Sequence, residues 1–204
     1  MSQYYVYIVF ASTPYKMGRM IRKVTGAEYN HVSVALDPEL KQMYSFARRN
    51  FHYPFIGGFV RESKARYHLN GEPADIKMCK IPVLPEKYAA LKDSLQKMEQ
   101  EKEKYLYNYL SILGMPFKRS IPVKDAYICV EFAVNVLRQV GYPLPSHQYY
   151  RIPDLEKILA SRVIYTGVIG QGDEDPAFFQ KNQIAHPYIS TLKGFVSLFP
   201  RLQF

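Results

Sequence analysis

Residues 31–47, HVSVALDPELKQMYSFA, contain two short apolar segments separated by an Asp-Pro pair. The segments 31–36 and 42–47 are rich in the β-branched and aromatic residues that favour strands. Asp37 and Pro38 are typical of a tight turn, because proline fixes φ and aspartate can accept nearby backbone N–H groups. The stretch therefore predicts a β-hairpin, and His31 is the first residue of its first strand.

A second informative stretch is 125–137, DAYICVEFAVNVL, which predicts a helix over about 128–140. Its apolar residues recur at helical spacing and share one face. Gly141 follows as a stop signal, since glycine readily adopts the left-handed conformation that ends a helix. Cys129 then lies in the first turn of this helix.

The rest of the chain adds strands and helices around these two features, which predicts an α+β fold. Segment 54–60 is expected to be a loop that enters an extended segment, 105–113 a helix or turn, and 142–153 a proline-containing loop. The other predicted strands are 4–10, 75–83 and 163–168, and the other predicted helices are 16–24 and 86–104.

The length and composition are those of one globular domain, 1–204. Hydrophobic residues make up 48% of the chain and charged residues 22%, so the bulk of it is not disordered. Segment 170–204 is expected to be a C-terminal extension whose role is unclear. The chain opens without a basic n-region, and no run of apolar residues approaches the length of a membrane span, so we expect a soluble, cytoplasmic protein.

The chain is basic, with 27 Lys and Arg against 18 Asp and Glu, a formal charge of +9. The basic residues are scattered, and no recognition-helix pattern, zinc-finger spacing or aromatic RNA-binding motif accompanies them. We therefore expect no specific nucleic-acid partner, while peripheral contact with an anionic membrane stays open. The oligomeric state is not indicated.

Cys129 is the candidate nucleophile. Unpaired N–H groups and the positive end of the helix dipole stabilise a thiolate at a helix N-terminus, and the same N–H groups can hold an oxyanion. The alternative is that Cys129 is a small buried apolar residue. Cys79 lies inside an alternating strand and is expected to be structural. With two cysteines and no Cys/His cluster, the sequence predicts neither a disulfide framework nor a metal site, and no cofactor is implied.

A nucleophilic cysteine needs a base, and His31 is the candidate among five histidines. Its place at the start of a strand would let it project into a cleft from a rigid element. The alternative is an ordinary hydrogen-bonded histidine. The others lie in polar or proline-rich segments and are expected at the surface: His52, His68, His147 and His186.

The base in turn needs a polar group to orient it. Tyr44 and Ser45 lie on the second strand of the hairpin and point to opposite faces, so only one of them can face His31. Ser45 is preferred, because Tyr44 and Phe46 share a face that is typical of core packing. A carboxylate would orient the imidazole more strongly, but the hairpin has none at this place.

Taken together, these residues resemble the circularly permuted branch of the NlpC-like papain-fold hydrolases. That branch includes the YiiX/YaeF-like amidases and, more distantly, lecithin–retinol acyltransferase. YNHVSVALD is similar to the family's His-strand motif and YICVEFAVNVL to its Cys-helix motif, in permuted order. The third position falls on or next to Ser45, where better-understood relatives often have Glu or His. The pair Tyr107-Asn108 resembles the aromatic turn that precedes the cysteine helix.

The resemblance covers about 4–140 and implies a permuted papain-like domain, with a small antiparallel sheet packed on the Cys129 helix. It implies a thiol hydrolase, an amidase or peptidase, that forms an acyl-cysteine intermediate on a peptide, amide or acyl-ester substrate. The N–H of Cys129, with Tyr107, would stabilise the oxyanion. The alternatives are a catalytically weak papain-fold binding module, an acyltransferase on lipid-like substrates, and a basic protein that docks on membrane or nucleic acid without covalent chemistry.

Overall fold

The computed structural model describes most of the chain. The described residues are 3–15, 18–19, 22–23, 26–53, 55–69, 71–114, 119–146, 149–181 and 186–203. Most of the helix predicted over 16–24 falls outside them, and so does His147.

The centre of the molecule is an eight-stranded sheet in the order β10-β7-β1-β2-β3-β4-β8-β9. All neighbouring strands are antiparallel except β8 and β9, which are parallel. The α+β prediction is therefore confirmed, but the expected small antiparallel sheet is in fact larger and mixed. The strands are β1 Tyr4–Ser12, β2 His31–Ala35, β3 Met43–Arg48, β4 Gly57–Glu62, β7 Asp75–Val83, β8 Leu106–Tyr107, β9 Ala126–Tyr127 and β10 Val163–Val168.

The predicted hairpin is confirmed as β2 and β3, which pair with Val34 opposite Tyr44. Asp37 shapes the connection, because its carboxylate accepts the backbone N–H groups of Lys41 at 2.9 Å and Gln42 at 2.7 Å. The two oxygens of this carboxylate accept backbone N–H groups that the hydrogen bonds between the strands leave unpaired. They thereby stabilise the turn and the register of the hairpin.

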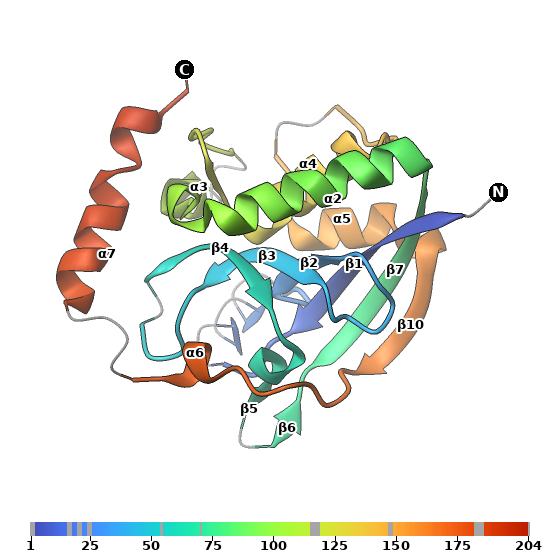
Figure 1. Cartoon of the computed structure of the whole chain (residues 1–204), viewed down its shortest axis with the longest axis horizontal. Coiled ribbons are helices and arrows are strands. Elements are labelled where there is room, and N and C mark those ends of the chain that lie inside the picture. Colours follow the sequence, from blue (N-terminus) through green and yellow to red (C-terminus); the bar gives the residue numbers. More distant parts are fainter. Residues whose placement is uncertain are drawn as a thin grey trace.

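Three helices cover one face of the sheet: α2 Pro85–Gln100, α4 Cys129–Gln139 and α5 Ile152–Ile158 (Figure 1). Helix α4 packs directly on β2 and β3. Its apolar side chains meet those of the strands in one cluster, in which Val32, Phe46 and Phe132 are almost fully buried. This packing sets the first turn of α4 beside the first residue of β2.

Both ends of α4 have local causes. At its N-terminus the Glu131 carboxylate accepts the N–H of Ile128 at 2.9 Å. At its C-terminus Gly141 has φ +81°, and the N–H groups of Gly141 and Tyr142 bond the carbonyls of Arg138 and Leu137. This is a Schellman ending, which glycine forms without steric cost. The stop predicted at Gly141 is confirmed.

The other face of the sheet carries a second apolar cluster that includes Val9, Ala11, Ile76 and the almost fully buried Tyr67. Tyr67 ends a 3₁₀ turn, η1 Lys64–Tyr67, which follows β4 directly. A small separate hairpin comes next, formed by β5 His68–Leu69 and β6 Glu72–Pro73.

Other boundaries differ from the sequence predictions. The helix predicted over 86–104 ends at Gln100 and continues as a 3₁₀ turn, η2 Lys102–Lys104. The segment predicted as helix or turn over 105–113 contains strand β8 and helix α3 Tyr109–Gly114. Segment 54–60, expected to be a loop that enters an extended segment, already contains most of strand β4. Another 3₁₀ turn, η4 Ala160–Arg162, precedes β10.

The C-terminal segment returns to the body of the protein through α6 Pro176–Phe179, α7 Pro187–Val196 and η5 Phe199–Arg201. The N–H of Phe51 donates to the carbonyl of Phe178 at 2.8 Å, and Leu198 is fully buried. Helix α7 lies along the edge of the molecule opposite β10 (Figure 1). The segment is thus packed on the rest of the chain at several points.

Among the described residues, no helix combines the length and the apolar character needed to cross a membrane.

Candidate active site

Cys129 is the first residue of α4, and it is only 7% exposed. The preceding residue, Ile128, occupies the N-cap position and makes no side-chain cap hydrogen bond. A Ser, Thr, Asp or Asn at this position would accept an N–H of the first turn. Because isoleucine has no such acceptor, it leaves these N–H groups to other partners. The start of α4 is therefore suited to stabilise negative charge beside the thiol.

His31 begins β2 and contacts the start of α4. The nearby thiol of Cys129 is among the groups that raise the pKa of its imidazole. The His31 side chain is 13% exposed, and it lines the cavity described below. The structure thus brings together the two residues that the sequence singled out as nucleophile and base, although 97 positions separate them in the chain.

The second nitrogen of the imidazole contacts Glu62, the last residue of β4. His31 Nε2 lies 3.0 Å from Glu62 Oε1, and the Glu62 side chain is only 3% exposed. Strand β4 reaches this place because it pairs with β3, with Glu62 opposite Met43. The Ser33 hydroxyl also lies 3.2 Å from the same ring nitrogen. Cys129, His31 and Glu62 thus bring together a thiol, an imidazole and a carboxylate, the three groups that a nucleophile–base–carboxylate array uses.

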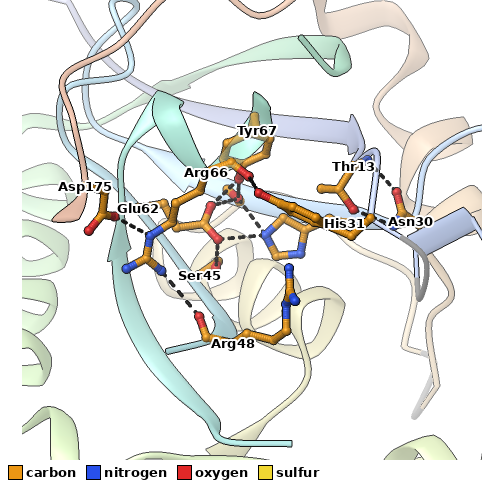
Figure 2. Close-up of polar contacts among 11 residues, drawn as sticks. Thr13, Asn30, His31, Ser45, Arg48, Glu62, Arg66, Tyr67 and Asp175 are labelled. Atoms are coloured by element: carbon orange, nitrogen blue, oxygen red, sulfur yellow. Dashed lines mark hydrogen bonds and ion pairs between the residues drawn. The ribbon is translucent and has the colours of Figure 1, made fainter. Parts of the chain in front are cut away.

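Three hydroxyl groups surround the buried carboxylate of Glu62 (Figure 2). Ser45 Oγ donates to Oε1 at 2.7 Å, and Ser33 Oγ donates to Oε2 at 2.7 Å. Tyr67 donates a short hydrogen bond to Oε2, and its hydroxyl also lies 2.7 Å from Ser33 Oγ. These bonds compensate much of the cost of burying a carboxylate, and they fix the direction in which it faces His31.

The third position therefore differs from the sequence prediction. Ser45 is in the site, but its hydroxyl contacts Glu62, while the carboxylate of Glu62 contacts His31. Tyr44 points to the opposite face, where it is 3% exposed and stacks on Phe59 with ring centroids 5.8 Å apart. The hairpin contains no carboxylate at this place, as the sequence indicated. The carboxylate that contacts His31 comes instead from the next strand, β4.

Of the two further site residues, Glu62 and Tyr67, only Glu62 had a signal in the sequence, and it was weak. Residues 59–62, FVRE, alternate apolar and charged side chains after a Gly-Gly pair, which favours a strand that continues to Glu62. The sequence does not show that this strand pairs with β3. The position of Tyr67, on a 3₁₀ turn beneath the sheet, has no comparable local pattern.

The carboxylate and the imidazole shift each other's protonation in opposite directions. Burial alone would lower the pKa of His31, but the charge of Glu62 and the contacts with Cys129 and Glu62 raise it to about 10. Burial alone would raise the pKa of Glu62, but the His31 charge and the bonds from His31 and Tyr67 lower it to about 2. Near neutral pH the pair is therefore an imidazolium and a carboxylate.

Tyr107 lies on β8, close enough to Cys129 for the two groups to interact electrostatically. Burial raises the pKa of Tyr107 well above its ordinary value, and the nearby Cys129 and Tyr109 raise it further. The phenol therefore keeps its proton at neutral pH and can act as a hydrogen-bond donor. Tyr107 also lines the same cavity as His31.

A cavity of about 930 Å³ opens beside this site. His31 and Glu62 form part of its wall, and most of the remaining wall is aromatic or aliphatic, with α7 contributing Leu192 and Phe195. The volume is within the range of about 300–1,000 Å³ that is usual for small-molecule sites. No family model, no curated protein and no solved structure matches this chain.

The remaining cysteine and histidines lie outside the array. Cys79 is fully buried in β7, and burial raises its pKa to about 12. His52 lines the cavity through an exposed side chain and bonds the Phe179 carbonyl, and His186 is exposed before α7, as predicted for both. His68 is instead half-buried in β5. Within the described ranges, no group of three His, Cys, Asp or Glu side chains could hold a metal ion.

Proposed function

We propose that this protein is a thiol hydrolase with a permuted papain-like fold, which cleaves an amide or ester through an acyl-cysteine intermediate. The observation that carries the proposal is the array in which Cys129 contacts His31 and His31 contacts Glu62. The three groups come from different elements, and two of them, His31 and Glu62, line the wall of a large cavity. A Cys–His pair with an orienting carboxylate is the arrangement that activates a thiol as a nucleophile.

In the first half of the reaction the thiol proton resides on His31, and the Cys129 sulfur attacks the carbonyl carbon of the substrate. The carbonyl oxygen becomes an oxyanion, which the N–H of Cys129 and the Tyr107 hydroxyl stabilise. The tetrahedral intermediate collapses, and His31 donates its proton to the departing amine or alcohol. This leaves the acyl group on Cys129.

In the second half, His31 takes a proton from a water molecule as the water oxygen attacks the thioester carbonyl. The intermediate expels the Cys129 sulfur, and the carboxylic acid product is released. Glu62 stays charged throughout and stabilises the imidazolium that each half requires. Ser33, Ser45 and Tyr67 hold Glu62 in place through the hydrogen bonds described above.

The apolar character of the cavity favours a second candidate, an acyltransferase that acts on a lipid-like substrate. The same acyl-cysteine would then be attacked by an amine or alcohol rather than by water. The two candidates share every step up to the acyl-enzyme, so the product formed in the presence of an acceptor distinguishes them.

The test uses p-nitrophenyl esters of short and long acyl chains and an acyl p-nitroanilide. We expect multiple turnovers by the wild-type protein and, on intact-mass analysis, one acyl group that maps to Cys129. Cys129→Ala should abolish both, whereas Cys79→Ala, a matched change in the buried strand β7, should retain both. Equal turnover by the wild type and Cys129→Ala would overturn the proposal. Acylation without release would favour the catalytically weak binding module.

A further inference from the structure

Two arginines line the wall of the cavity that also contains His31: Arg48, the last residue of β3, and Arg66 in η1. Figure 2 shows the Arg48 side chain extending from the end of β3 toward the imidazole of His31. The two guanidinium groups have different surroundings, and this difference points to a ligand.

Arg66 has a counter-ion within the protein. Its Nε lies 2.6 Å from Asp175 Oδ2, and both side chains are largely buried. Asp175 belongs to the C-terminal segment, so this pair also joins that segment to the body of the protein. The charge of Arg66 is therefore already compensated.

Arg48 has no such partner. All 18 acidic residues of the sequence lie in the described ranges, and among the described residues Arg48 takes part in none of the ion pairs. Its Nη1 donates to the Phe51 carbonyl at 3.2 Å, and its guanidinium lies over the Tyr15 ring, 4.4 Å from the centroid. These contacts hold the group in place, but they leave its positive charge without an anion.

The environment makes this lack of an anion unfavourable. Burial lowers the pKa of Arg48, and the neighbouring charge of Arg66 lowers it further, against the opposing effect of Tyr15. A half-buried cation of this kind gains strongly from a bound carboxylate or phosphate, because guanidinium forms bidentate hydrogen bonds to both.

We propose that Arg48 binds an anionic group of the substrate, and that the apolar part of the same molecule fills the aromatic cavity. This inference rests on the proposed function and names its substrate class: an amphiphilic amide or ester with a carboxylate or phosphate near the scissile carbonyl. The hydrolysis itself stays as described above, and Arg48 is a specificity-determining residue.

Binding is measured by calorimetry in Cys129→Ala, which cannot turn the substrate over. The probes are N-dodecanoylglycine, dodecyl phosphate and the neutral N-dodecanoylglycinamide. We expect at least one anionic probe to bind about tenfold or more tightly than the neutral amide, consistent with charge-assisted hydrogen bonds. The tighter of the two anionic probes identifies carboxylate or phosphate as the recognised group.

Arg48→Met in the same background should remove this preference and leave the affinity for the neutral probe unchanged. Arg48→Lys keeps the charge without the bidentate geometry, so it should retain part of the preference for the anionic probes. If Arg48→Met does not fold, Arg48→Lys is the variant that tests the role of Arg48. The matched control is Arg61→Met, because Arg61 on β4 is half-exposed outside the cavity and pairs with Glu99 at 3.7 Å. That control should bind all probes as the parent does.

Equal affinity for anionic and neutral probes, no binding of either anionic probe, or a preference that survives Arg48→Met would each overturn the inference. Turnover measurements distinguish a failure of this inference from a failure of the proposed hydrolase function. If the wild type hydrolyses N-dodecanoylglycine and its neutral amide with equal KM and kcat, the hydrolase proposal stands and the role of Arg48 falls. If nothing is hydrolysed but binding depends on Arg48, the anion site stands and the hydrolase proposal falls.

Discussion

The carboxylate of Glu62 lies 3.0 Å from Nε2 of His31, across a sheet in which their strands are not neighbours. Strand β3 separates β2 from β4, and it contributes Ser45, whose hydroxyl donates to the same carboxylate oxygen. Three adjacent strands therefore define the direction of one imidazole ring.

Cys129 is expected to be the reactive thiol, and Cys79 is expected to be inert. Cys129 contacts an imidazolium at a helix N-terminus, whereas burial raises the pKa of Cys79 to about 12. Treatment of the native protein with iodoacetamide near pH 6.5, followed by mass mapping of the adducts, checks this at a pH where ordinary thiols are protonated. Faster labelling of Cys79 would show that the assignment is wrong.

Replacement of His31 should slow the alkylation of Cys129 between about pH 6 and pH 7, because the imidazolium that favours the thiolate is lost. His31→Ala is compared with His186→Ala, which changes an exposed histidine before α7. Circular dichroism of both variants checks that the fold is retained. An unchanged rate–pH profile in His31→Ala would exclude His31 as the partner of the thiol.

Loss of the Glu62 charge should reduce turnover more than loss of the hydroxyl that holds it. Glu62→Gln removes the charge that stabilises the imidazolium, and we expect about a hundredfold decrease in kcat, near ~3 kcal/mol. Ser45→Ala removes one charge-assisted hydrogen bond and should cost about tenfold, near ~1.5 kcal/mol. Steady-state kinetics on one ester substrate gives both values.

The matched control for these variants is Tyr44→Phe, because Tyr44 packs in the core and keeps its ring. The kcat of Tyr44→Phe should equal that of the wild type. A damaging Tyr44→Phe together with a silent Ser45→Ala would contradict the strand register described above. Wild-type turnover in Glu62→Gln would mean that the orientation of His31 does not depend on the carboxylate.

The pair should also make stability depend on pH. The lowered pKa of Glu62 means that its contribution is present above about 4.5 and is lost as the pH falls through about 2. The raised pKa of His31 means that its contribution is present below 6.5 and is lost as the pH rises through about 10. The excess of the wild-type free energy of unfolding over that of Glu62→Gln should therefore be largest between pH 4.5 and 6.5.

Urea unfolding of both proteins at about pH 3, 5.5 and 9 measures this difference. Glu72→Gln, a change at an exposed position of β6, controls for the general effect of removing a carboxylate. A difference that stays constant across the three pH values would contradict the linkage between Glu62 and His31.

The sequence by itself predicted the features that depend on local order. Strand-forming residues on either side of Asp37-Pro38 predicted the hairpin, and helical spacing with a glycine stop predicted α4. These two elements carry His31 and Cys129, so the candidate base and nucleophile could be named without coordinates. Local steric and hydrogen-bonding preferences act within a few residues, and they leave a readable pattern.

Only the tertiary structure decided which group faces His31. Glu62 reaches the imidazole because β4 pairs with β3, and Tyr67 reaches Glu62 because the turn after β4 folds beneath the sheet. The return of the C-terminal segment to Arg66 is likewise a long-range contact. Strand pairing and the burial of one carboxylate among three hydroxyls depend on the whole sheet, because long-range register and desolvation are properties of the assembled fold and of no short segment.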